Sequence, residues 1–328
     1  MPGVRRKVSS VWFAVAGVLF VSSGNAFESC PRGRYSSCLD ANALWLRPGD
    51  SDFITVAAST PRSVGFRAGA SWVERPLSLE VAAPDASGRE IPLVERALDE
   101  HVLLAFGVGP RLELGLAWVT VLRQSGTGPN GIQSQSGVRL AATAVRDPRF
   151  GFGYVALDRD GLDVSLRADV ALPFGDPDAY ASAGAVTAAP SAVVRVEAGR
   201  VALGAELGAR LRPSVELGSV RQGSQLYAAI ALSVRLFAPL RLSVEAFALP
   251  SLVDSTSARA RDLGLSVRSL PAEWLASLRW APLPRFSAAL AGGSGLPLSS
   301  EKRAGQSDAF LGSTSPEFRG LVDLGYSY

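Results

Sequence analysis

Residues 162–174 carry the pattern that most constrains the fold, because apolar and polar side chains alternate along the whole segment. Its even-numbered positions are all apolar, whereas its odd-numbered positions include Asp163, Ser165, Arg167 and Asp169. Successive side chains of a β-strand point to opposite faces, so the segment has one apolar face and one ionic face. A helix would scatter the same charges around its axis. The alternation therefore predicts a strand that separates two different environments.

Two classes of β protein contain such a strand. In a soluble sandwich the ionic face contacts water and the apolar face packs in a core. In an outer-membrane barrel the apolar face contacts lipid and the ionic face lines the lumen. One strand does not distinguish the classes, so the number and spacing of the other strands decide between them.

Eleven further segments have strand patterns and similar lengths. They are residues 63–75, 97–107, 112–124, 149–157, 191–198, 201–212, 225–237, 240–249, 272–280, 285–293 and 317–328. The total is about twelve strands, within a range of about 10 to 14. Each strand is close in length to the 9 to 11 residues, roughly, that a tilted membrane strand needs, which suits a barrel. Tight turns alternate with long connections rich in Gly, Ser and Pro, as in outer-membrane barrels. We therefore predict an all-β fold, a transmembrane antiparallel up-and-down β-barrel over residues 63–328.

The N-terminus resembles an export signal. Arg5, Arg6 and Lys7 precede an apolar run over residues 11–21, and small residues lead up to Ala26. This order predicts a signal peptide over residues 1–26, because the apolar run is too short for an anchor helix. We expect an exported protein of the Gram-negative outer membrane, in which residues 27–62 are a periplasmic lead-in.

Charge and cysteine content agree with export. The chain has 33 basic and 30 acidic residues, and removal of the three signal-peptide cations leaves 30 of each. The mature protein is then formally neutral, so we expect no nucleic-acid partner. In the oxidising periplasm we expect the only two cysteines, Cys30 and Cys38, to form a disulfide.

The last predicted strand resembles the C-terminal signal that the barrel-assembly machinery reads in outer-membrane proteins. Five residues carry the match: Gly320, Val322, Leu324, Tyr326 and the terminal Tyr328. The resemblance implies outer-membrane lipid as the surroundings of the barrel and the assembly machinery as its partner during biogenesis.

Four stretches extend the resemblance to a family. Residues 39–45, 142–149, 172–176 and 293–297 look like the barrel domain of Gram-negative proteins of the OmpA-family or MetA-pathway phenol-degradation-type transporter group. The resemblance implies an outer-membrane barrel. Members often carry a C-terminal peptidoglycan-binding domain, which we do not expect here, and the resemblance supplies no catalytic residue and no substrate.

The ionic faces of the strands provide the candidate site. Nine charged side chains are expected to line a lumen constriction: Arg167, Asp169, Arg195, Glu197, Glu206, Arg210, Arg235, Glu245 and Arg279. Arginines and carboxylates in a confined space should pair across it. Such a network either orients polar solutes in a pore or fills the barrel and conducts nothing.

Catalytic and metal chemistry find little support in the sequence. The only histidine, His101, shares a face with Asp99, but no serine can be placed beside it. No His/Cys spacing suits a metal, and no cofactor is expected. We therefore expect no enzyme. The leading prediction is a porin-like channel for passive transport of small solutes, and the alternative is a non-conducting structural or surface-recognition barrel that acts through long external loops.

Overall fold

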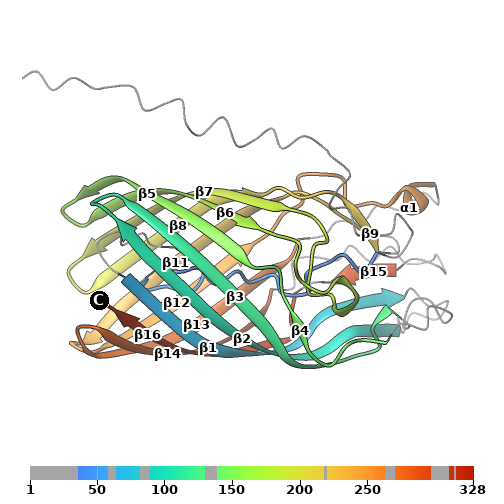
Figure 1. Ribbon diagram of the computed structural model, residues 1–328, viewed down its shortest axis with the longest axis horizontal. Coiled ribbons are helices and arrows are strands. Elements are labelled where there is room, and N and C mark those ends of the chain that lie inside the picture. Colours follow the sequence, from blue (N-terminus) through green and yellow to red (C-terminus); the bar gives the residue numbers. More distant parts are fainter. Residues whose placement is uncertain are drawn as a thin grey trace, which may run out of the picture.

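The computed structural model describes residues 36–49, 51–57, 64–81, 89–129, 139–217, 220–262, 270–296, 310–313 and 315–328. The predicted signal peptide, residues 1–26, and Cys30 lie outside these ranges. In the part of the chain that is described, no helix is long and apolar enough to cross a membrane. Figure 1 shows one elongated barrel whose strands run obliquely to its long axis.

Twelve antiparallel strands form the wall of the barrel. They are β1 (Val64–Val81), β2 (Arg89–Val108), β3 (Leu112–Ser125), β5 (Arg149–Arg159), β6 (Leu162–Ala171), β7 (Thr187–Ala198), β8 (Val201–Arg210), β11 (Gln225–Phe237), β12 (Leu240–Ala248), β13 (Ala272–Leu283), β14 (Phe286–Gly295) and β16 (Phe318–Ser327). Each pairs with its sequence neighbour in this series, and β1 pairs with β16 to close the sheet. The predicted fold class is confirmed, and each predicted strand overlaps one of the twelve.

The connections have the expected alternation of lengths. Tight turns join strands at the end where the C-terminus lies, and Gly161 and Gly199 adopt φ of 77° and 62° there, which favours glycine. The long connections at the other end contain short elements. They are β4 (Ala144–Val145), η2 (Pro177–Ala179), β9 (Val215–Leu217), β10 (Val220–Gln222), α1 (Ala258–Asp262) and β15 (Phe310–Ser313).

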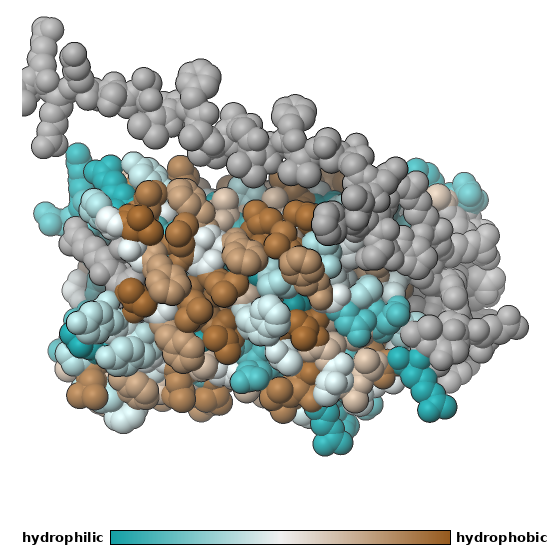
Figure 2. Space-filling model, in the orientation of Figure 1, coloured by the Kyte–Doolittle hydropathy of each residue, from teal (hydrophilic) through white to brown (hydrophobic). Residues whose placement is uncertain are grey.

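The outer wall of the barrel is apolar. Leu166, Leu207 and Ile230 are 50%, 59% and 66% exposed, whereas Arg167 and Arg210 are buried. Brown apolar side chains cover much of the wall in Figure 2. A soluble sandwich would bury this apolar face and expose the arginines, so the side-chain orientation selects the membrane barrel.

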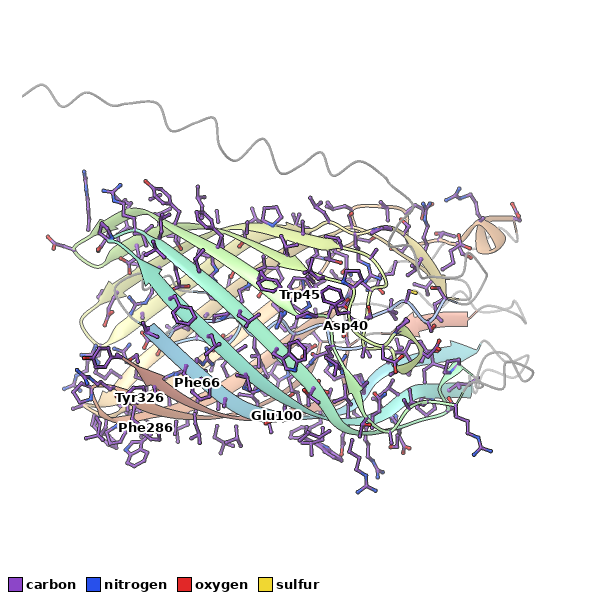
Figure 3. The ribbon with its side chains drawn as sticks, viewed as in Figure 1. Asp40, Trp45, Phe66, Glu100, Phe286 and Tyr326 are labelled. Atoms are coloured by element: carbon purple, nitrogen blue, oxygen red, sulfur yellow. The ribbon has the colours of Figure 1, made fainter. Side chains whose placement is uncertain are left out.

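Aromatic side chains mark the short-turn end of the outer wall. Phe286 of β14 pairs with Tyr326 of β16, which pairs with Phe66 of β1. Figure 3 shows the three together at that end. Rings in a row across neighbouring strands are typical of the aromatic belt at a membrane interface.

The expectation of a periplasmic lead-in is wrong for residues 36–49 and 51–57, which lie inside the barrel. We call this segment the plug. At the long-loop end the Ser36 N–H donates to the Glu216 carbonyl, and at the opposite end Asp52 contacts Arg195 and Arg241. The segment therefore runs along most of the lumen, where it is drawn in blue in Figure 1.

The reason for this placement is the small size of many inward-facing residues. Ala202, Ala229 and Ala231 leave space that the wall cannot fill, and Phe53 and Ile54 of the plug pack into the same cluster of buried side chains. A core thus forms inside the barrel between plug and wall. Burial of the apolar side chains of the lead-in in this core is more favourable in free energy than their exposure to water.

Candidate functional site

Two carboxylates of the wall bind the backbone of the plug halfway along the lumen. Glu245 of β12 accepts hydrogen bonds from the Ile54 N–H at 2.8 Å and from the N–H and hydroxyl of Thr55, both at 2.7 Å. Glu206 of β8 accepts one from the Ala57 N–H at 3.0 Å. Buried carboxylates need such donors, so the plug satisfies groups that the wall leaves unpaired.

Arg47 adds an ion pair to this layer. Its guanidinium contacts Glu206, lies 3.4 Å from the Asp169 carboxylate and donates to the Ser191 hydroxyl at 3.1 Å. Arg47 is 7% exposed, and its partners come from β6, β7 and β8. One cation of the plug therefore links three strands of the wall.

Three arginines contact the plug in a different way, because each donates to a backbone carbonyl. Arg212 donates to the Cys38 carbonyl at 3.0 Å, Arg210 to the Ala43 carbonyl at 2.8 Å and Arg149 to the Leu46 carbonyl at 2.9 Å. None of the three lies within ion-pair distance of a carboxylate among the described residues. We call this series the carbonyl-bound arginines.

The ring of Trp45 lies beside two of them. The guanidinium carbon of Arg149 is 4.8 Å from the ring centroid, and that of Arg210 is 4.4 Å from it. Both distances fit cation–π contacts. Figure 3 shows Trp45 in the interior of the barrel, with Asp40 on its long-loop side.

Charged groups surround the short-turn mouth. Arg195 contacts Asp52 at 2.8 Å and Glu197 at 2.6 Å, while Arg235 contacts Glu197 at 2.9 Å and Arg241 contacts Asp52 at 2.7 Å. A cavity open to solvent is lined by Asp52, Arg235 and Arg241. This mouth is open to solvent, and beyond it the plug occupies the lumen.

Other buried ion pairs hold the wall itself together. Arg319 binds Glu273 at 2.8 and 3.1 Å, Arg167 binds Glu113 at 3.0 Å, and Arg67 binds Asp323 at 2.7 Å. These pairs join strands of the wall, so they differ from the plug contacts.

His101 and Asp99 do not form a pair. His101 Nε2 lies 3.1 Å from Asp323, and Asp99 binds Arg146 at 3.1 Å. Burial alone would lower the pKa of Arg146, but the carboxylates of Asp99 and Asp40 raise it above its ordinary value. Arg146 therefore stays charged and ties the loop before β5 to both the wall and the plug.

The nine residues predicted for the constriction all lie on the inner side of the wall, in three groups. Asp169, Glu206, Glu245 and Arg210 contact or adjoin the plug at mid-lumen, and Arg195, Glu197 and Arg235 lie at the mouth. Arg167 pairs with Glu113, and Arg279 donates to the Ser287 hydroxyl at 3.3 Å. Their role in a constriction stays a prediction.

The plug residues are those that sequence reasoning missed. Trp45, Arg47, Asp52 and Thr55 supply the contacts of the lumen, yet they precede the first predicted strand. One signal for them existed, namely the number of Gly and Ala residues at inward positions of the strands. Small inward residues leave space in the lumen that an additional segment or water can fill.

Comparison with solved structures finds a similar fold in outer-membrane proteins. The crystal structure of an outer-membrane channel from Pseudomonas putida F1 is similar with a TM-score of 0.55 and 13% identity, over 87% of this chain and 100% of that one. The NanC porin follows with 0.49 and 8%, over 80% and 98%, and the KdgM porin with 0.46 and 6%, over 80% and 99%. No family model and no curated protein sequence matches the chain.

The fold is that of an outer-membrane β-barrel. The likeness to the Pseudomonas channel extends over the full length of that protein. At 13% identity it establishes architecture, while the solute and the state of the lumen must be argued from the residues of this chain.

Proposed function

We propose that this protein is an outer-membrane channel for passive transport of small solutes, closed by its own N-terminal segment. The observation that carries the proposal is the way in which the lumen is filled. A single extended segment occupies the lumen and is held there by non-covalent contacts. Buried charged groups of the wall lie beside this segment. Withdrawal of that segment would leave a polar wall that water can solvate, which a conducting pore requires.

A barrel that serves only as a rigid frame needs no removable occupant, because side chains of the wall can fill its interior. Here the side chains of Glu245, Glu206 and Arg210 form hydrogen bonds with the plug. Each of these groups can exchange its plug partner for water when the segment leaves, so the free-energy difference between closed and open states is smaller than the burial of charges suggests.

The cellular setting is part of the same proposal. Export by the signal peptide over residues 1–26, insertion by the barrel-assembly machinery and a disulfide between Cys30 and Cys38 suit an outer-membrane channel. Cys38 is disulfide-bonded, and the only other cysteine is Cys30. The resemblance to the OmpA-family or MetA-pathway transporter group is consistent with this setting.

Planar-bilayer recordings test the proposal. We expect rare openings for the wild-type protein and a higher open probability for Arg47→Ala/Phe53→Ala, because that double change removes the ion pair to Glu206 and apolar packing of the plug. Phe174→Ala, at an exposed loop residue, is the matched control and should behave as wild type. Absence of current steps in every variant would instead favour the recognition barrel.

A further inference from the structure

The carbonyl-bound arginines have less charge compensation than the buried arginines that form ion pairs with carboxylates. Arg210 is 5% exposed and donates from Nη1 to the Ala43 carbonyl, while its Nε and Nη2 atoms have no hydrogen-bond partner. By contrast, Arg167 and Arg319 each face a carboxylate at 3.0 Å or less. A buried cation without a counter-charge is costly, so an anion would be bound favourably beside Arg210.

The group that now occupies this position is an aromatic ring. The Trp45 side chain contacts the guanidiniums of both Arg149 and Arg210, and carbonyl oxygens of the same segment take one N–H from each. The plug thus offers a ring and partial negative charges to two cations. A small molecule with a ring and a full negative charge would satisfy both cations better.

We propose that Arg149 and Arg210 form a binding site for a small aromatic anion, such as an aromatic carboxylate, which competes with Trp45. This inference rests on the proposed channel function and names the class of solute. The carboxylate would accept hydrogen bonds from the free N–H groups of Arg210, and the ring would take the place of the indole. We call the position the Trp45 site.

The route to the Trp45 site begins at the long-loop end. A cavity there is lined by Arg212, Arg210, Arg149 and Trp45, so the third carbonyl-bound arginine lies on the way in. Arg212 also has an unpaired Nε atom. Three successive cations, two of which (Arg210 and Arg212) have unsatisfied donors, would draw an anion inward, and displacement of Trp45 would loosen the plug at the same step.

Binding measurements on the detergent-solubilised full chain test the site. Isothermal titration with benzoate should give saturable binding to Trp45→Ala that is about tenfold tighter than to wild type, because the competing ring is absent. Adding Arg210→Gln should weaken it by about tenfold or more, because the charged donor is lost. Trp274→Ala, which alters an outward-facing tryptophan, is the matched control and should bind as wild type does.

Two analogues separate the proposed site from a simple hole left by the indole. Cyclohexanecarboxylate keeps the charge without the π system, and benzyl alcohol keeps the ring without the charge. Benzoate should bind more tightly than either, and Arg149→Gln should repeat the effect of Arg210→Gln in a second variant. Equal affinity for benzyl alcohol and benzoate, or benzoate binding unaffected by both arginine changes, would overturn the proposal.

Conductance distinguishes this inference from the channel function on which it rests. Current steps without benzoate binding would contradict the proposed Trp45 site and would still support the channel function. Benzoate binding with no current in any variant would contradict the channel function and would support a ligand-binding barrel. In the expected case, benzoate raises the open probability of the wild-type protein and the Arg210→Gln change abolishes that rise.

Discussion

At the scale of single residues, the lumen depends on glycines whose missing side chain makes room for the plug. A Cβ atom on Gly204 would lie 2.8 Å from a ring carbon of Phe53 and 3.1 Å from Val56. Neighbouring inward positions are alanines. The wall is therefore shaped to its occupant at the level of one methyl group.

Gly204→Ala should loosen the plug, because the added methyl must push the Phe53 ring aside. Overpacking of this kind costs about 1 to 3 kcal/mol. Limited proteolysis should then cut residues 36–57 faster than in wild type, and the barrel should keep its strand content by circular dichroism. Gly292→Ala, whose new methyl would meet nothing closer than 3.8 Å, is the control and should leave the rate of cleavage unchanged. Equal cleavage of the two variants would contradict the tight fit.

At the scale of elements, each wall strand separates lipid from a charged interior. In β11 the exposed Ile230 and Leu232 lie on the opposite face from the buried Tyr227 and Ser233. The register of neighbouring strands keeps this division, because Ile230 pairs with Ala205 and with Ala246. A slip of one residue would turn every charge to lipid, so the pattern determines the register.

Position along the strand should set the cost of a charge on the outer face. Ile230→Arg, midway along β11, should destabilise the folded barrel by about 2 to 4 kcal/mol, and Leu236→Arg, near the turn, by about 0 to 1 kcal/mol. Urea unfolding in lipid vesicles measures both. The two residues lie on one face of one strand, so Leu236→Arg is the depth control. Similar losses for the two variants would argue against a membrane midplane near Ile230.

At the scale of the whole molecule, the barrel is a closed sheet that encloses its own core. The strands β1 and β16, far apart in sequence, pair over ten positions from Gly65 to Glu74. The plug lies in the space inside, held by Glu245 and Glu206 and by the carbonyl-bound arginines. The sheet is closed by the β1–β16 pairing, whereas the lumen is occupied by the plug.

The C-terminal strand offers a test of assembly by the barrel-assembly machinery. Tyr326 and Tyr328 are 49% and 73% exposed on the outer wall, so replacing both by Ser removes no internal packing. We expect Tyr326→Ser/Tyr328→Ser to lower the amount of folded protein in the outer membrane of cells several-fold, while the purified variant refolds in detergent as wild type does. Phe66→Ser, an exposed aromatic on β1, is the control for lost membrane contact. Equal losses for both variants would exclude a specific signal.

Much of the fold follows from local patterns that any single strand displays. The alternation in residues 162–174 predicts β6 with Arg167 and Asp169 inside, and the same reasoning assigns Glu206, Arg210 and Glu245 to the lumen. This reasoning works because side chains of a strand alternate between its two faces with a period of two residues, whatever surrounds the strand. The number of strands and the alternation of turn and loop lengths then exclude a sandwich.

The sequence by itself therefore determined the barrel, its apolar outer wall and the set of charges within. Only the tertiary structure decided which of those charges meet, and that the plug lies in the lumen. The Ile54 N–H binds a carboxylate 191 residues further along the chain, and no local pattern encodes such a contact. It arises from the volume that twelve inward faces leave empty, a quantity that exists only once the sheet has closed.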